Sequence, residues 1–127
     1  MTRKHRWSAG HRSTKGQNKT EARFEAWLKA RPEVVEFGYE PLRFVLANAA
    51  NYTPDFVALL EDGTVEVWEI KGSMGWSMDT ASQVRWKAAA ETFVGGLFTF
   101  RTAHERRKKD GGGWNVKTYE RRNPWPK

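Results

Sequence analysis

The 127-residue sequence contains no cysteine, which excludes disulfide bonds and thiolate zinc sites. A chain without cysteine suits a reducing compartment, so we expect a cytoplasmic protein. No apolar run approaches the ~20 residues that span a bilayer, and the basic N-terminus has no apolar segment typical of a signal peptide. The sequence also lacks an internal repeat. These absences favour one domain with its own core and no membrane partner.

Positive charge is concentrated at the two ends of the chain. The formal net charge is +7, with a balance of +7 over residues 1–31, −6 over residues 32–100 and +6 over residues 101–127. Basic flanks around an acidic centre are typical of a protein that holds a polyanion and gathers carboxylates for another purpose. The plainer alternative is an ordinary solvated surface with basic tails. We favour nucleic-acid binding.

The composition along the chain indicates three parts. A basic flexible arm is expected over residues 1–18, a globular domain over residues 19–119 and a basic tail over residues 120–127. Lysine and arginine side chains in the arm, in the second predicted helix and in a basic run near the C-terminus are expected to contact DNA phosphates. These candidates are Arg3, Lys4, Arg6, Arg12, Lys15, Lys19, Arg85, Lys87, Arg106, Arg107, Lys108 and Lys109.

Hydrophobic periodicity predicts a helix, a strand, a hairpin, a second helix and two more strands, in that order. Asn18 or Thr20 can cap the first helix, which is expected to end near Ala30. The other expected elements are extended segments over 37–46, 53–60, 65–71, 97–102 and 114–119, a second helix from residue 79 or 80 to 93, and a basic loop over 104–113. This order predicts an α/β fold with a small mixed central sheet flanked by helices.

Three charged side chains are expected to meet at one end of the predicted hairpin. Successive residues of a strand face opposite sides, so Glu69 and Lys71 share one face. The segment 61–64 reads Glu-Asp-Gly-Thr, a strong turn signal. The turn places Asp55, at the start of the outgoing strand, opposite Glu69 near the end of the return strand.

Two carboxylates pressed together repel each other unless a cation lies between them. Mg²⁺ prefers oxygen ligands and keeps several waters, so Asp55, Glu69 and one backbone carbonyl would suit it, and Mn²⁺ is expected to substitute. Glu21, on the first predicted helix, could supply a further carboxylate. Such a site is suited to phosphodiester hydrolysis, in which Lys71 would hold or deprotonate the attacking water or stabilise the transition state.

A strand that ends in Glu-Ile-Lys can also simply meet solvent with a cross-strand ion pair. The catalytic interpretation depends on the combination of features around it. Pro54-Asp55 stands fourteen residues before Glu69, a glycine turn lies between them, and a helix carboxylate lies upstream. Together these features favour an active site, because a motif becomes specific through its structural context.

The pattern Pro54-Asp55 followed by Glu69-Ile70-Lys71 resembles the motif of the PD-(D/E)XK nuclease superfamily. The resemblance covers roughly residues 20–102 and implies a restriction-endonuclease-like core. Within the superfamily, the sequence looks most like the phage endonuclease I family of Holliday junction resolvases from the T-odd phages. The segments that carry this closer likeness are 20–21, 37–40, 44–46 and 51–56.

This resemblance implies roles for individual residues. The catalytic set would be Glu21, Asp55, Glu69 and Lys71. The metal ligands would be Asp55, Glu69, the backbone carbonyl of Ile70, and Glu21 with Glu25 as the alternative helix carboxylate. The resemblance also implies a homodimer acting in DNA recombination, with an extended bridge at residues 44–52 through which the two halves exchange elements.

The sequence therefore predicts a Mg²⁺-dependent, structure-selective DNA endonuclease that cuts branched DNA and takes no small-molecule substrate. If a phage encodes the chain, the cytoplasm would be that of the host cell. Two alternatives stay open: a nuclease that acts on duplex, nicked or end-bearing DNA, and a catalytically silent DNA- or RNA-binding module on the same fold.

Overall fold

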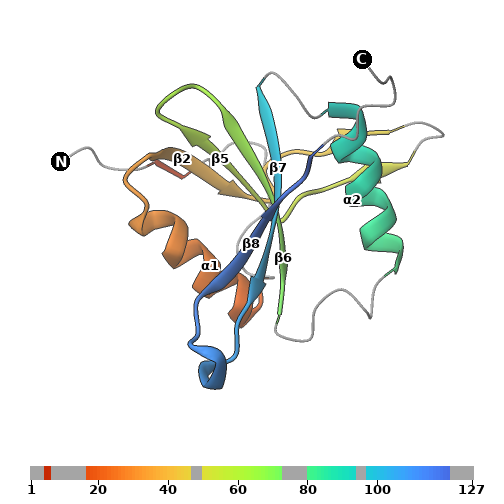
Figure 1. Cartoon of the computed structure of the whole chain (residues 1–127). Coiled ribbons are helices and arrows are strands. Elements are labelled where there is room, and N and C mark those ends of the chain that lie inside the picture. Colours follow the sequence, from red (N-terminus) through yellow and green to blue (C-terminus); the bar gives the residue numbers. More distant parts are fainter. Residues whose placement is uncertain (1–4, 7–16, 47–49, 73–79, 94–96, 121–127) are drawn as a thin grey trace, which may run out of the picture.

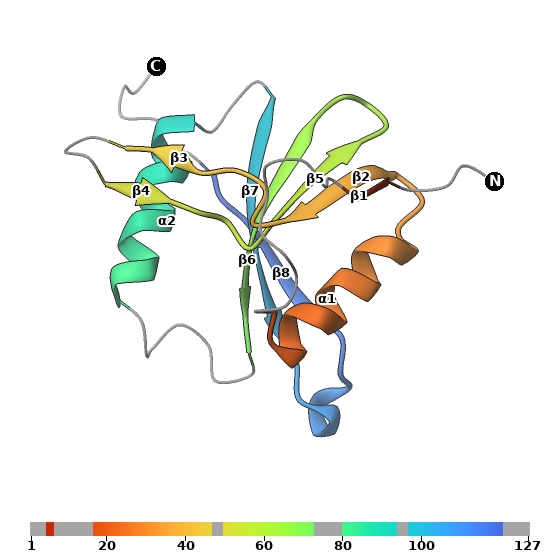
Figure 2. The ribbon, with the colours of Figure 1, turned by 180° about the vertical axis from the view of Figure 1, so that it is seen from behind.

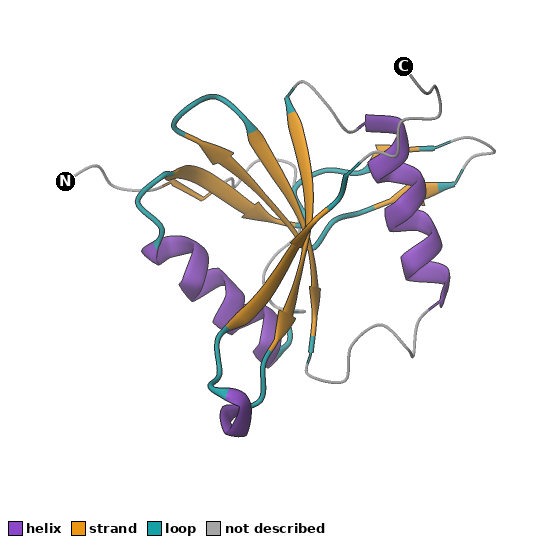
Figure 3. Cartoon of the chain, in the orientation of Figure 1, coloured by secondary structure: helices purple, strands orange, loops and turns teal. Residues whose placement is uncertain are grey.

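The computed structural model describes residues 5–6, 17–46, 50–72, 80–93 and 97–120. Its elements are β1 (His5–Arg6), α1 (Lys19–Ala30), β2 (Val34–Tyr39), β3 (Phe44–Val45), β4 (Asn51–Tyr52), β5 (Phe56–Leu60), β6 (Val65–Lys71), α2 (Thr80–Phe93), β7 (Phe98–Glu105), a 3₁₀ turn (Lys108–Asp110) and β8 (Trp114–Thr118). The main sheet has the order β1-β2-β5-β6-β7-β8, and β3 and β4 pair separately. The predicted mixed α/β class is confirmed (Figures 1 and 3).

Strand β6 lies at the centre of the sheet and sends alternate side chains into two cores. It pairs antiparallel with β5 and parallel with β7. Trp68 and Ile70 pack with Phe24 of α1 in one core, whereas Val67 packs with Phe100 and residues of α2 in the other. The two helices therefore cover opposite faces of the sheet, and Figure 2 shows them on opposite sides of the central strands. No helix in the described part of the chain is long and apolar enough to cross a membrane.

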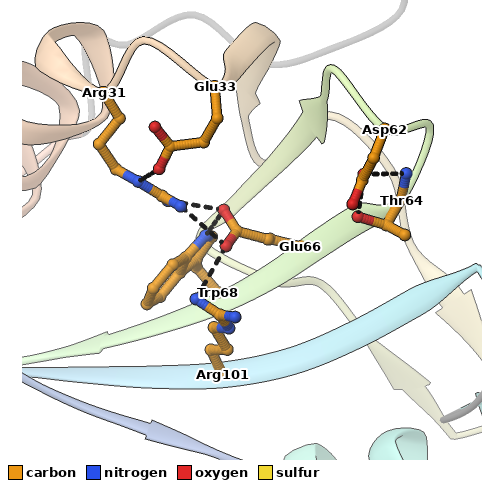
Figure 4. A network of polar contacts seen from close by, with 7 residues as sticks. All are labelled: Arg31, Glu33, Asp62, Thr64, Glu66, Trp68 and Arg101. Carbon is orange, nitrogen blue, oxygen red and sulfur yellow. Dashed lines mark hydrogen bonds and ion pairs between the residues drawn. The ribbon is translucent and has the colours of Figure 1, made fainter.

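The α1 face of β6 holds a buried carboxylate between two arginines (Figure 4). Glu66 is 1% exposed. Arg31 donates to both of its oxygens, at 2.7 and 3.1 Å, and Arg101 forms an ion pair with it at 2.9 Å. Trp68 Nε1 donates to the same carboxylate at 3.2 Å. Because Arg31 follows α1 and Arg101 lies on β7, the network ties the end of the helix to the sheet.

Of the two expected caps, Asn18 and Thr20, Asn18 is the one that caps α1. Its Oδ1 accepts from the Glu21 N–H at 2.8 Å, and Glu21 Oε1 accepts from the Asn18 N–H at 3.0 Å. This reciprocal pair is a capping box, which satisfies two helix donors that otherwise have no intrahelical partner. The capping box therefore fixes the position of the Glu21 side chain within its own helix.

Replacing Asn18 with Ala is expected to lower the free energy of unfolding by about 1 kcal/mol, because the cap acceptor is lost. Urea denaturation measures this change. Asn18→Ser keeps a side-chain oxygen at the cap and should cost clearly less. Equal losses for the two variants would show that the capping hydrogen bond does not stabilise α1.

The bounds of α2 and β6 match the prediction, but several other strands differ from it. Where extended segments were expected over 37–46, β2 begins at Val34 and ends at Tyr39, and β3 covers only Phe44–Val45. Strand β7 continues through His104 and Glu105, which the sequence places in a basic loop. The reason is a partner strand, since His104 pairs with Asn115 and Glu105 with Trp114 of β8. Strand β5 begins at Phe56 rather than Thr53.

Two described residues of the predicted arm, which spans residues 1–18, form a short strand. His5 and Arg6 pair in parallel with Glu36 and Phe37 of β2. An edge strand exposes unpaired N–H and C=O groups that any extended segment can join. Asn18, the last residue assigned to the arm, is the cap of α1.

The segment 44–52 also differs from the extended bridge that the resemblance implies. Phe44 pairs with Tyr52 and Val45 with Asn51, antiparallel. Phe44 and Tyr52 are buried in the α2-side core, so apolar burial holds both arms of the segment against the same chain. The described part of this segment is a hairpin that folds back on itself.

Candidate active site on the α2 face

Asp55 and Glu69 lie opposite each other where β5 begins. The register pairs Phe56 with Trp68, and one residue further along it places Asp55 beside Glu69. Two backbone contacts fix this geometry: the Asp55 N–H donates to the Trp68 carbonyl at 3.1 Å, and the Ile70 N–H donates to Asp55 Oδ2 at 2.7 Å. The negative charge of Glu69 acts on Asp55, as expected for neighbouring carboxyl groups. The predicted meeting of Asp55 and Glu69 is therefore present.

The environment of Asp55 disfavours its charged form. Burial raises the pKa of the Asp55 carboxyl well above its usual range, and the negative charge of Glu69 raises it further. The Ile70 N–H opposes these effects, and Glu21 adds a smaller repulsion. A cation that binds both carboxyl groups would relieve their repulsion and so stabilise the folded protein.

Each oxygen of the Glu69 carboxylate has a neighbour in the chain. The Tyr52 hydroxyl donates to Oε1 at 2.5 Å, and Lys71 Nζ lies 3.4 Å from Oε2. Glu69 is 5% exposed. Burial, followed by the charge of Glu69, raises the pKa of Tyr52 well above its usual range, so the phenol stays a hydrogen-bond donor. Tyr52 from β4 and Lys71 from β6 thus orient the carboxylate from two sides.

Glu21 and Glu25 occupy different places on α1. Glu21 is buried, accepts from the Tyr39 hydroxyl at 3.3 Å and contributes to the charge around Asp55. Glu25 accepts from Gln17 at 3.3 Å and pairs with Lys29 at 3.5 Å. Of the two helix carboxylates, Glu21 is the one whose charge acts on Asp55.

A cavity of about 230 Å³ opens beside the carboxylate pair. The described residues that line it come from β4, the segment before β5, β6 and α2: Asn51, Tyr52, Thr53, Asp55, Glu69 and Arg85. Arg85 is an exposed residue of α2 and contributes a guanidinium to the lining. The cavity therefore presents carboxylates and a cation to the same space.

The other predicted DNA contacts are distributed unevenly. Lys19 and Lys87 are exposed on α1 and α2, and residues 106–109 are exposed between β7 and β8. Arg6 lies in β1. Arg3, Lys4, Arg12, Lys15 and most of the tail lie outside the described residues.

The pair of acids fits a magnesium ion in its donor chemistry. Within the described part of the chain, no group of three or more His, Asp or Glu side chains is arranged to hold a metal, so Glu21 does not complete a three-carboxylate site. Mg²⁺ is commonly held by only one or two carboxylates, with waters and substrate phosphates filling its other positions. Asp55 and Glu69 would provide those two, and the Ile70 carbonyl remains a predicted third ligand.

Comparison of the chain with protein-family models, with curated proteins and with solved structures found no significant match. The interpretation of the site therefore rests on the residues themselves and on their geometry.

Tyr52 is the site residue that sequence reasoning missed. It stands three residues before Asp55, within a segment already noted for its likeness to the junction resolvases. A tyrosine there suggests no role until β4 is known to fold over the sheet. The one sequence feature that points to Tyr52 is its position in segment 51–56, which also contains Asp55.

Proposed function

We propose that the chain is a Mg²⁺-dependent endonuclease of the PD-(D/E)XK type. The observation that carries this proposal is the coupled pair Asp55 and Glu69 with Lys71 beside it, on one face of a hairpin. A surface ion pair would explain Glu69 and Lys71 alone. It would not explain a second carboxyl placed against Glu69, because two neighbouring carboxylates repel each other when no cation binds there.

The reaction proposed is hydrolysis of a phosphodiester, in which a water oxygen bonds to phosphorus as a P–O bond to one nucleotide breaks. Bound Mg²⁺ would supply Lewis acidity and lower the pKa of water. Asp55 and Glu69 hold the ion, and Tyr52 keeps the Glu69 carboxylate in place. Lys71, as the ammonium partner of Glu69, stabilises negative charge developing on the phosphoryl oxygens.

We propose DNA as the substrate, with branched DNA preferred, a homodimer as the active form and the cytoplasm as its location. The basic ends of the sequence and the cationic turn between β7 and β8 support a polyanionic partner. The preference for branches and the dimer rest on the resemblance to the junction resolvases. Selection of branches would come from DNA shape rather than from base edges.

Cleavage of a labelled four-way junction and of the matching linear duplex, with and without Mg²⁺, tests this function. We expect paired cuts near the branch point that require the metal. Equal cutting of the duplex would support a nuclease but contradict the preference for junctions. Tight binding without cleavage in Mg²⁺ or Mn²⁺ would indicate a catalytically silent binding module instead of an enzyme.

A further inference from the structure

A second and larger cavity lies on the same face of the sheet as the carboxylates. Its volume is about 490 Å³, within the usual range of ligand pockets. Helix α2 contributes Gln83, Trp86 and Lys87, and the sheet contributes Thr102, His104 and Lys117 among others. The proposed hydrolysis uses none of these residues.

The sheet connects this cavity to the proposed active site by direct strand pairing. Glu69 of β6 pairs with Thr102 of β7, and Thr102 pairs with Lys117 of β8. Neighbouring strands lie about 4.8 Å apart, so Lys117 stands about 10 Å from Glu69 across the sheet. A second row, two residues along, runs from Lys71 to His104. Both rows face α2.

The two cavities on this face differ in their charged residues. Asp55 and Glu69 line the smaller cavity, and Lys87 and Lys117 line the larger one. Burial lowers the pKa of His104, and the positive charges of Lys117 and Lys71 lower it further. Both ammonium groups therefore act on the cavity. Among the described residues that line the cavity, the exposed Glu120 is the one acid.

We propose that this cavity binds a backbone phosphate of the nucleic acid a few nucleotides from the bond that is cut. Lys87 and Lys117 supply the charge, and Gln83 and Thr102 supply uncharged hydrogen-bonding groups. Lysine is a common point-charge partner for phosphate. A separation of about 10 Å corresponds to roughly three nucleotides at 3.4 Å each. This inference rests on the proposed nuclease function.

Binding of a fluorescent DNA substrate, measured without metal, tests the cavity separately from cleavage. Lys117→Gln and Lys87→Gln should each weaken binding by roughly fivefold or more at low salt and reduce the slope of log affinity against log salt by about 1. Glu120→Gln should strengthen binding. Lys29→Gln is the matched control, because Lys29 is an exposed lysine of α1 paired with Glu25.

A set of substrates in which one phosphate at a time is a neutral methylphosphonate identifies the bound phosphate. The wild type should lose affinity at one position a few nucleotides from the cut, and Lys117→Gln should be insensitive there, as expected for two changes that remove the same contact. If the wild type cuts DNA but Lys117→Gln and Lys87→Gln bind it like Lys29→Gln, the cavity proposal is overturned and the nuclease stands. If the wild type neither binds nor cuts, both are overturned.

Discussion

Asp55→Asn is expected to abolish Mg²⁺-dependent cleavage and, without metal, to make the folded protein more stable at neutral pH. Cleavage should fall at least about 100-fold, the scale of losing one electrostatic group that acts on the transition state. Stability should rise because the amide keeps the size of the side chain but removes its repulsion with Glu69. Each kcal/mol recovered corresponds to about 4 °C in Tm for a domain of this size.

The pH dependence of stability follows from the raised pKa of Asp55. In the metal-free protein, the folded state holds the Asp55 proton more tightly than the unfolded chain does. This carboxyl therefore reduces stability as pH rises above its ordinary value of 3.8 and through its raised folded value. The Tm difference between Asp55→Asn and the wild type should be small in acid and grow with pH across that window.

Mg²⁺ should make the wild type more stable than Asp55→Asn, which is the reverse of the order expected without metal. At a concentration 100 times its Kd, a ligand stabilises the folded state by about 2.7 kcal/mol, so Mg²⁺ should raise the Tm of the wild type and leave Asp55→Asn nearly unchanged. Lys71→Ala is the informative companion, because it should lose cleavage while still responding to Mg²⁺. If Asp55→Asn cuts DNA normally, or if it is less stable than the metal-free wild type at every pH, the metal site is the wrong interpretation.

Glu66→Ala is expected to cause a large loss of stability. The change leaves the guanidinium groups of Arg31 and Arg101 and the indole N–H of Trp68 without their shared acceptor. Removing one partner of a buried ion pair typically costs about 3–5 kcal/mol. Denaturation in urea should show a lower midpoint with little change in slope.

Asp62→Ala is the control for this prediction. Asp62 is an exposed residue of the turn before β6. Its carboxylate accepts hydrogen bonds from the Thr64 N–H at 2.9 Å and from the Thr64 hydroxyl at 2.6 Å (Figure 4). We expect a loss of about 1 kcal/mol or less. Similar losses for the two variants would show that the arginines find other partners and that the network adds no stability.

The sequence predicts the elements whose signals are local. Asn18 and Thr20 indicate the start of α1, the Glu-Asp-Gly-Thr turn indicates the hairpin, and alternation within β6 places Glu69 and Lys71 on the same face. The opposition of Asp55 and Glu69 follows from the same turn. These predictions succeed because a few adjacent residues decide each of them.

Features that depend on distant segments were not predictable in the same way. The partners of Glu66 stand 35 positions before it and 35 positions after it in the chain, so a lone glutamate in an apolar strand gives no hint of them. The extension of β7 requires β8, and the position of Tyr52 requires β4 to fold over the sheet. In each case the strand or side chain gains its role from tertiary pairing.

The pleat of β6 separates two kinds of constraint within one short segment. Glu66, Trp68 and Ile70 project toward α1, where they hold the molecule together, while Glu69 and Lys71 project toward α2, where the proposed chemistry occurs. In a substitution scan along the strand, changes at Glu66, Trp68 and Ile70 should mainly lower stability. Changes at Glu69 and Lys71 should mainly lower the rate of cleavage. Residues that stabilise the fold and residues of the proposed active site are thus immediate neighbours in the chain, on opposite faces of one strand.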